Sequence, residues 1–188
     1  MKVDRIHHVA YRCCDAKETV LWYKQMLNMD FILAIAEDDV PSTKEPDPYM
    51  HVFLDAGAGN VLAFFELPTK PAMGRDPNTP EWVQHIAFKV KDRAELLAYK
   101  SHLERNGVKV LGVTDHGAFH SIYFFDPSGH RIELAYPDPE EEATLKRLEA
   151  VKWLMLEEWS RTKRAPPHAA FLHAHGRQDN GLLTEVKP

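Results

Sequence analysis

Two stretches of the chain share one pattern of apolar and polar positions. Residues 7–15 and 84–92 both alternate apolar and polar side chains and both end at an aspartate, with an offset of 77 residues (84 − 7 = 77). In each copy that aspartate, Asp15 or Asp92, precedes apolar residues at helical spacing and is well suited to cap a helix N-terminus. The pattern therefore predicts a strand followed by a helix, twice.

Three short runs of strand character follow each predicted helix. They are FILAIA, YMHVFLD and VLAFFEL in the first copy and VKVLGV, HSIYFFD and HRIELAY in the second. Glycine-containing turns at residues 56–60 and 126–129 join the last two runs of each copy. We predict an α+β fold in which two βαβββ modules, residues 1–67 and 82–137, form a cupped mixed sheet.

Other segments of the chain follow different rules. Residues 68–81 contain four prolines and no periodicity, which indicates a linker or a loop over a site. Residues 138–164 are acidic at the start, basic at the end and carry an apolar stripe, which predicts a long amphipathic helix. That stripe must pack on the sheet or on a second subunit, and we expect a homodimer. Residues 165–188 are expected to form an extended or poorly ordered tail.

Composition narrows the classes of function. The chain has 188 residues and a formal charge of −5 at pH 7, without a cluster of Lys and Arg among aromatics, so we expect no nucleic-acid partner. We expect no membrane insertion, because no apolar run approaches the roughly 20 residues that a span needs. The two cysteines, Cys13 and Cys14, are adjacent, so a disulfide between them would be strained. A reducing, cytoplasmic location is expected.

Three residues stand out as candidate metal ligands. The repeat makes His8 and His85 equivalent, and a pseudo-twofold axis between the modules would bring equivalent residues of the first strands together. Glu133 is a lone carboxylate among apolar residues, where an unpaired charge would be costly and a cation would resolve that cost. Two imidazoles and one carboxylate form a facial triad, which leaves coordination positions open and suits Fe(II). The cupped sheet is therefore expected to surround a metal site.

The motifs HHVAYRCCD, QHIAFKVKD and IYFFDPSGHRIEL resemble those of the vicinal oxygen chelate superfamily. The run from His116 to Glu133 is similar to the metal-binding half of the type I extradiol catechol dioxygenases. That resemblance implies Fe(II) held by His8, His85 and Glu133, a catechol-like substrate chelating the iron, and O2 as co-substrate. It also implies that His116 and Tyr123 are catalytic residues that hydrogen-bond the substrate or the bound oxygen.

Two features depart from that pattern. Extradiol enzymes carry a proton-transfer histidine on the strand that corresponds to NVLAFFEL, and the best-matching position here is Asn60, whose amide cannot transfer a proton. His51 or His120 could replace it from a neighbouring strand. It also stays open whether the metal ligands meet within one chain or across two subunits.

Two alternative functions remain on the same fold. In the glyoxalase I branch a fourth ligand, here Glu66, joins a Ni(II) or Zn(II) site and the enzyme is an isomerase or lyase; Mn(II) is a further possible metal. Matching the glycines of the two turns, however, puts Ala63 and not Glu66 at the position equivalent to Glu133. The other alternative is a non-catalytic ligand-binding protein, a class whose members commonly lack the metal triad.

Overall fold

The computed structural model describes residues 2–173, and within them the predicted repeat is present. The first module consists of β1 (Val9–Cys13), α1 (Ala16–Leu27), β2 (Phe31–Asp39), β3 (Pro46–Asp55) and β4 (Val61–Glu66). The second consists of β5 (His85–Lys89), α2 (Arg93–Arg105), β6 (Leu111–Asp115), β7 (Phe119–Phe125) and β8 (Arg131–Pro137). The predicted α+β class and the βαβββ order of both modules are confirmed.

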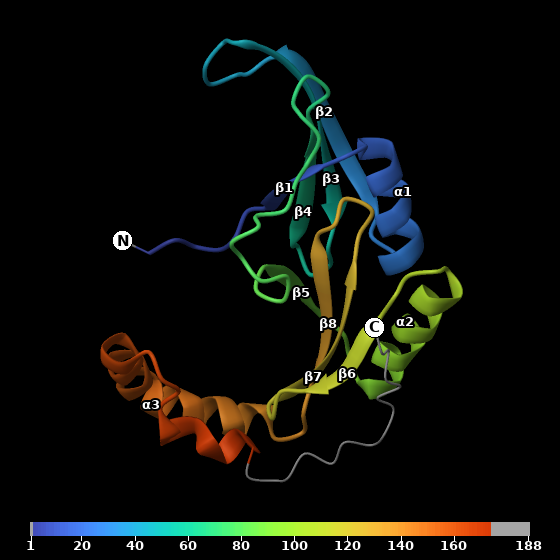
Figure 1. The fold of residues 1–188 in the computed structure, drawn as a ribbon. Coiled ribbons are helices and arrows are strands. Elements are labelled where there is room, and N and C mark those ends of the chain that lie inside the picture. Colours follow the sequence, from blue (N-terminus) through green and yellow to red (C-terminus); the bar gives the residue numbers. More distant parts are fainter. Residues whose placement is uncertain (1, 174–188) are drawn as a thin grey trace.

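Each module has its own four-stranded mixed sheet, ordered β1-β4-β3-β2 in one and β5-β8-β7-β6 in the other. The first strand of each module runs parallel to the last, and the remaining neighbours are antiparallel. Equivalent pairs occupy equivalent registers, since Ala10 faces Ala63 and Ala87 faces Glu133. The two sheets form the arms of an open arc, with α1 and α2 on its outer side (Figure 1).

The helices begin where the sequence predicts. Asp15 Oδ1 accepts a hydrogen bond from Glu18 N at 2.7 Å, and Asp92 Oδ1 accepts one from Glu95 N at 2.9 Å. These bonds satisfy amide groups of the first helical turn that have no partner within the helix. From these starts α1 and α2 pack their apolar faces on the convex sides of the sheets, and the largest fully buried apolar side chains are Tyr23, Phe64, Phe124, Leu54, Leu62, Leu96, Leu103, Ile122 and Ile132.

Polar contacts between the modules fix how they sit together. The hydroxyl of Tyr23 on α1 donates to Asp126 Oδ2 in the β7–β8 turn at 3.1 Å, and both residues are buried. His130 Nε2, from the same turn, lies 2.6 Å from Arg12 O at the end of β1. The end of β1 therefore lies against the start of β8.

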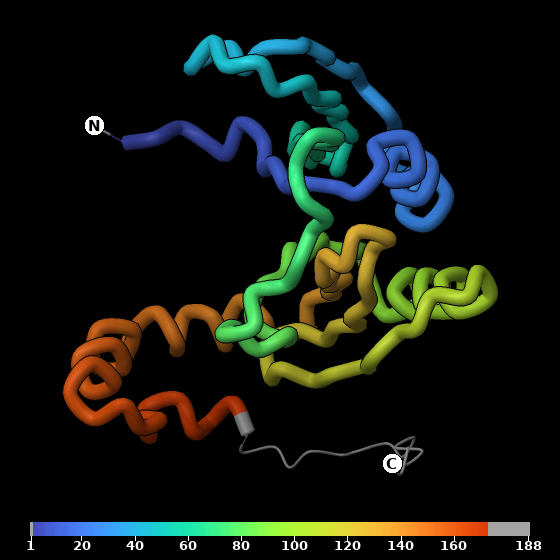
Figure 2. The backbone as a smooth tube through the Cα atoms, turned by 45° about the horizontal axis from the view of Figure 1, so that its top comes forward, coloured from blue at the N-terminus to red at the C-terminus, as the bar shows by residue number. Residues whose placement is uncertain are grey.

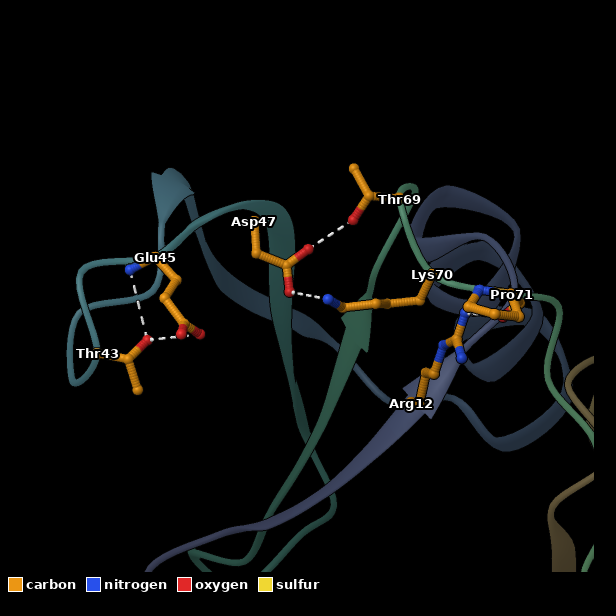
Figure 3. Close-up of polar contacts among 7 residues, drawn as sticks. All are labelled: Arg12, Thr43, Glu45, Asp47, Thr69, Lys70 and Pro71. Carbon is orange, nitrogen blue, oxygen red and sulfur yellow. Dashed lines mark hydrogen bonds and ion pairs between the residues drawn. The ribbon is translucent and has the colours of Figure 1, made fainter.

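The segment between the modules is held against the first sheet. Arg12 Nη2 donates to Pro71 O at 2.7 Å, and Lys70 Nζ forms an ion pair with Asp47 Oδ2 at 2.8 Å (Figure 3). From there the segment crosses from the first module to the second (Figure 2), and the Arg75 guanidinium lies 4.7 Å from the ring centroid of Phe125 on β7. The linker thus runs alongside the junction of the two modules.

The C-terminal part differs in one respect from the expectation. The long helix is present as α3 (Glu141–Thr162), but residues 167–173 of the expected extended tail form a 3-10 helix, η1 (Pro167–His173), which packs on α3. Arg147 lies 3.7 Å from the ring centroid of Phe171 there, which gives the short helix a packing partner. Residues 174–188 lie outside the described part of the chain. In residues 2–173 no helix is long and apolar enough to cross a bilayer.

Candidate metal centre

His85 and Glu133 meet on the concave face of the second sheet. β5 and β8 run side by side, and His85 Nε2 lies 2.9 Å from Glu133 Oε2. The Glu133 carboxylate is only 3% exposed, and its Oε1 accepts a hydrogen bond from the buried Ser121 hydroxyl on β7. His85 Nδ1 lies 3.0 Å from Val83 O, which fixes the orientation of the ring. Two of the three predicted metal ligands are therefore adjacent and held in place.

Tyr123 and His116 form a second pair beside the first. Tyr123 lies opposite Glu133 in the β7–β8 register, and its hydroxyl is 2.8 Å from His116 Nε2. Burial raises the pKa of Tyr123 to about 12, with the nearby Glu133 carboxylate as the next cause. Burial also lowers the pKa of His116. We therefore infer that at neutral pH Tyr123 keeps its proton and the His116 ring is neutral, so that His116 Nε2–H can donate to the Tyr123 oxygen and leave the phenol hydrogen free for another acceptor.

His8, the third predicted ligand, lies elsewhere in the chain. Its Nδ1 is 2.8 Å from Nδ1 of His7, and its ring centroid is 6.1 Å from that of His51 and 5.8 Å from that of Phe53. Within residues 2–173, no group of three His, Cys, Asp or Glu side chains converges closely enough to hold a metal ion. One chain thus assembles two of the three residues, and the complete triad stays a prediction.

A contact at the end of β1 explains the separation of His8 from His85. The expected axis would have brought the starts of β1 and β5 together, but the end of β1, at Arg12, is the part that lies against His130. His85 starts β5 and is paired with Arg131, next to His130. His8 precedes Arg12 by four residues, which is about 13 Å of extended chain. His8 therefore lies at the far end of β1 from the His85–Glu133 pair.

His51 is one of the two histidines that the sequence offered as a replacement for the proton-transfer residue. It lies on β3, is buried, and stacks on Phe65 with 3.6 Å between ring centroids. Its Nε2 is buried and has no hydrogen-bond partner among the described residues. Burial lowers the pKa of this imidazole, and the charge of the neighbouring His8 lowers it further. Period-two alternation in YMHVFLD puts His51 and Phe53 on one face, which is a signal in favour of His51.

The other positions considered for proton transfer are placed less favourably. Asn60 lies in the turn before β4, where its Nδ2 donates to Gly57 O at 2.9 Å. His120 follows Phe119 on β7, and its ring stacks on Tyr136. Because Ser121 is the neighbour that faces Glu133, alternation directs His120 to the opposite side of that sheet. Of the three, His51 is the one beside a predicted ligand.

Glu66 has a structural partner. Its Oε2 accepts a hydrogen bond from Ala16 N, the first residue of α1, at 2.7 Å. In the register it pairs with Cys13, at the opposite end of β1 from His8, while Ala63 occupies the position equivalent to Glu133. The Glu66 carboxylate thus stabilises the start of α1. This role argues against the alternative in which Glu66 is a fourth metal ligand.

The residues present fit a divalent cation. A carboxylate with 3% exposure is costly unless hydrogen bonds and a positive charge compensate it, and within residues 2–173 no Lys or Arg forms an ion pair with Glu133, whose contacts include the Ser121 hydroxyl and the His85 imidazole. An imidazole nitrogen and a carboxylate oxygen 2.9 Å apart are donors that both Fe(II) and Mn(II) accept. Tyr123 and His116, hydrogen-bonded to each other, border this pair with groups able to contact a bound ligand.

Comparison with known proteins identifies the family. Residues 5–134 match the model of the glyoxalase/bleomycin resistance protein/dioxygenase superfamily, and the chain belongs to that superfamily. Among curated proteins it is similar to MhqA of Bacillus subtilis, which is named as a candidate ring-cleaving dioxygenase. The identity is 28% over 88 residues, 47% of this chain and 28% of that relative. The chain therefore spans well under a third of the relative that it matches.

Solved structures agree on the fold. A glyoxylase/bleomycin resistance protein/dioxygenase domain from Frankia sp. EAN1pec has a TM-score of 0.58 at 16% identity, covering 73% of this chain and all of that one. The fosfomycin resistance protein FosX from Listeria monocytogenes, in complex with Mn(II) and sulfate, has a TM-score of 0.52 at 19% identity. That match covers 76% of this chain and 99% of the FosX chain. At these identities the likeness extends to the fold alone.

Proposed function

We propose that this protein is an Fe(II)-dependent, extradiol-type dioxygenase that cleaves a catechol-like aromatic ring. The observation that carries the proposal is the pair His85–Glu133, 2.9 Å apart, beside the pair Tyr123–His116, 2.8 Å apart, on one face of one sheet. The resemblance of this face to the extradiol enzymes and the similarity to MhqA support the same reaction. In this proposal His8 completes the ligand set.

Each residue of this face has a distinct role in the proposed reaction. The metal, when bound, supplies chelation of both catechol oxygens and activation of O2. Ser121 holds the Glu133 carboxylate in one orientation, and Val83 O holds the His85 ring. Tyr123 donates a hydrogen bond at the substrate oxygens, since its raised pKa keeps the proton on the phenol, and His116 orients that hydroxyl.

His51 is the residue we propose for proton transfer. A neutral imidazole with an unpartnered Nε2 can accept a proton at that atom and return it later. The stacking of its ring against Phe65, and the nearby ring of Phe53, give the first sheet an aromatic wall beside His8 that suits a flat substrate. Replacement of His51 by glutamine keeps a polar side chain of similar size but removes the acid–base function, so it should lower kcat while leaving metal content unchanged.

We propose further that a second copy of the chain supplies His8 to the His85–Glu133 pair. β2 is exposed at all nine positions, which leaves apolar side chains uncovered on both of its faces: Phe31, Ile32, Leu33 and Ile35. Leu111 and Val113 on β6 are exposed as well. A twofold dimer in which the first sheet of one chain faces the second sheet of the other would cover both regions and form two identical sites.

The activity is tested on protein purified without oxygen and reconstituted with Fe(II). A panel of catechols is then added with O2, and oxygen uptake and a yellow ring-fission product are followed. We expect both with the wild-type protein and neither with Glu133→Gln. Tight binding of Ni(II) or Zn(II) with no oxygen uptake on any catechol would overturn the proposal and favour the glyoxalase-type reaction, whereas binding of the catechols without turnover would favour a ligand-binding protein.

The shared site is tested with mixed dimers. His8→Ala and His85→Ala chains are each expected to be inactive, because every site in either homodimer lacks one ligand. In a hybrid dimer one site lacks both histidines and the other site has both. About half of the dimers in an equal mixture are hybrids, so about a quarter of the wild-type sites should be recovered. No recovery in a mixture proven to contain hybrid dimers would contradict the sharing of ligands, while leaving the proposed reaction untouched.

A further inference from the structure

Arg131 is a cation on the same face as the candidate metal centre. It begins β8 two residues before Glu133, so alternation puts the two side chains on one face. In the register it lies opposite His85 on one side and Phe125 on the other. Its guanidinium carbon lies 4.3 Å from the ring centroid of Tyr123. The positive charge is thus next to three of the residues in the proposed site.

The hydrogen-bonding capacity of Arg131 is largely unused. Its Nε is buried and has no partner in residues 2–173, and none of the ion pairs within these residues includes it. Arg12 is a useful contrast, because its Nε is also buried without a partner but its Nη2 already donates to Pro71 O at 2.7 Å. A buried donor without an acceptor costs free energy, so Arg131 is poised for an acceptor from outside the described chain.

We infer that Arg131 binds an anionic group of the substrate, a carboxylate held by the guanidinium while the metal holds the ring oxygens. The guanidinium lies over the aromatic ring of Tyr123, and its planar fork of donors matches the two oxygens of a carboxylate. Residues two apart on a strand are separated by about 7 Å, which is close to the span of one substituted benzene ring. The identity of the substrate as a carboxylated catechol rests on the proposed function.

The charges around Arg131 favour this assignment over a purely local role. Glu133 lies two residues along β8 on the same face, but its two oxygens are already contacted by Ser121 and by His85. A metal bound there would add positive charge close to the guanidinium and increase the demand for an anion. A carboxylate of the substrate would compensate the positive charges of the metal and of the Arg131 guanidinium.

The first experiment measures anion binding without metal. Benzoate and its neutral analogue benzamide are titrated into the metal-free protein and followed by NMR. The variants are Arg131→Met, which keeps the length of the side chain, Arg131→Lys, which keeps the charge without the fork, and Arg105→Met, a control at an exposed arginine of α2. We expect wild-type protein to bind benzoate more tightly than benzamide. Arg131→Met should bind benzoate about ten- to a hundredfold more weakly than wild type, and Arg105→Met should bind it with unchanged affinity.

The second experiment uses the Fe(II)-loaded protein under argon and compares 3,4-dihydroxybenzoate with 4-methylcatechol. The carboxylated ligand should lose affinity in Arg131→Met and the neutral one should not. The inference would be overturned if wild-type protein bound benzoate and benzamide with equal affinity. It would also be overturned if both Arg131 variants bound benzoate as wild type does while their thermal midpoints stayed normal. If neither catechol binds the loaded protein but benzoate still depends on Arg131, the proposed function fails and the anion site stands.

Discussion

Replacing Tyr23 with phenylalanine removes one hydroxyl from the junction between the two modules. That hydroxyl donates to Asp126 Oδ2 at 3.1 Å, while Oδ1 of the same carboxyl accepts from His130 N at 2.8 Å. Tyr23 is 1% exposed and Asp126 is 5% exposed, so water cannot take the place of the lost donor without a rearrangement. The substitution therefore removes a hydrogen bond from a buried carboxylate oxygen.

The expected loss follows from that geometry. A hydrogen bond to a charged, buried group contributes about 1.5–3 kcal/mol, and solvent screening is small at this exposure. In a chain of this size each kcal/mol corresponds to about 2–4 °C, so the thermal midpoint should fall by about 3–12 °C. Tyr99→Phe on α2, where the ring is only partly buried, is the matched control and should shift the midpoint by much less.

The loss should also depend on pH with a defined sign. Burial raises the pKa of Asp126, and the charge of His130 and the bond from Tyr23 partly oppose that rise. Above the pKa that Asp126 has in the folded state, its buried negative charge lowers the free energy of unfolding. This destabilisation disappears as the pH falls below that pKa. Removal of the hydroxyl raises that pKa further. The difference in free energy of unfolding between Tyr23→Phe and wild type should therefore be largest at neutral pH and small in acid.

Urea denaturation of both proteins across this pH range measures the gap. Equal free energies of unfolding for Tyr23→Phe and Tyr99→Phe at neutral pH would refute the reasoning. That result would mean that the contact between α1 and the β7–β8 turn is absent in solution, and the placement of His8 far from His85 within one chain would lose its basis.

Three further predictions concern the site and its support. Glu133→Gln keeps the shape of the side chain without its charge. Loss of a group that only supports a ligand weakens metal binding about 10–100-fold, and loss of the ligand itself should weaken it more. An unchanged metal affinity by titration would exclude Glu133 as a ligand. Asp15→Ala removes the cap of α1 and should lower the free energy of unfolding by about 1 kcal/mol, as Asp92→Ala should for α2, and a loss at only one position in thermal melts would contradict the equivalence of the two caps. Leu33→Lys places a charge on the exposed β2 and should shift the protein to a monomer without activity; a dimer of unchanged mass by light scattering would exclude β2 from the interface.

Local patterns in the sequence were sufficient to predict the modules. Alternation, the capping aspartates and the glycine turns act over a few residues, and each is found where it was expected. The alignment of the two turns correctly made Ala63 the counterpart of Glu133. The sequence left His51 and His120 open as replacements for the proton-transfer histidine, because it does not show which side chains of neighbouring strands share a face. In the structure His51 is the one that lies beside His8.

The placement of the modules relative to each other was beyond the reach of those patterns. It depends on contacts such as Tyr23 with Asp126, which are 103 residues apart and leave no periodic signal. For that reason the equivalence of His8 and His85 was correct as a repeat but did not imply that the two rings meet within one chain. Glu66 was similarly ambiguous, since its partner, the amide of Ala16, lies on an element 50 residues away.

X-ray absorption spectroscopy of the anaerobic Fe(II)-loaded protein tests most directly the claim that two imidazoles and one carboxylate hold the metal. The account predicts one iron per chain with two imidazole ligands in the wild type, and one imidazole in both His8→Ala and His85→Ala. A wild-type spectrum with a single imidazole that His8→Ala leaves unchanged would contradict it.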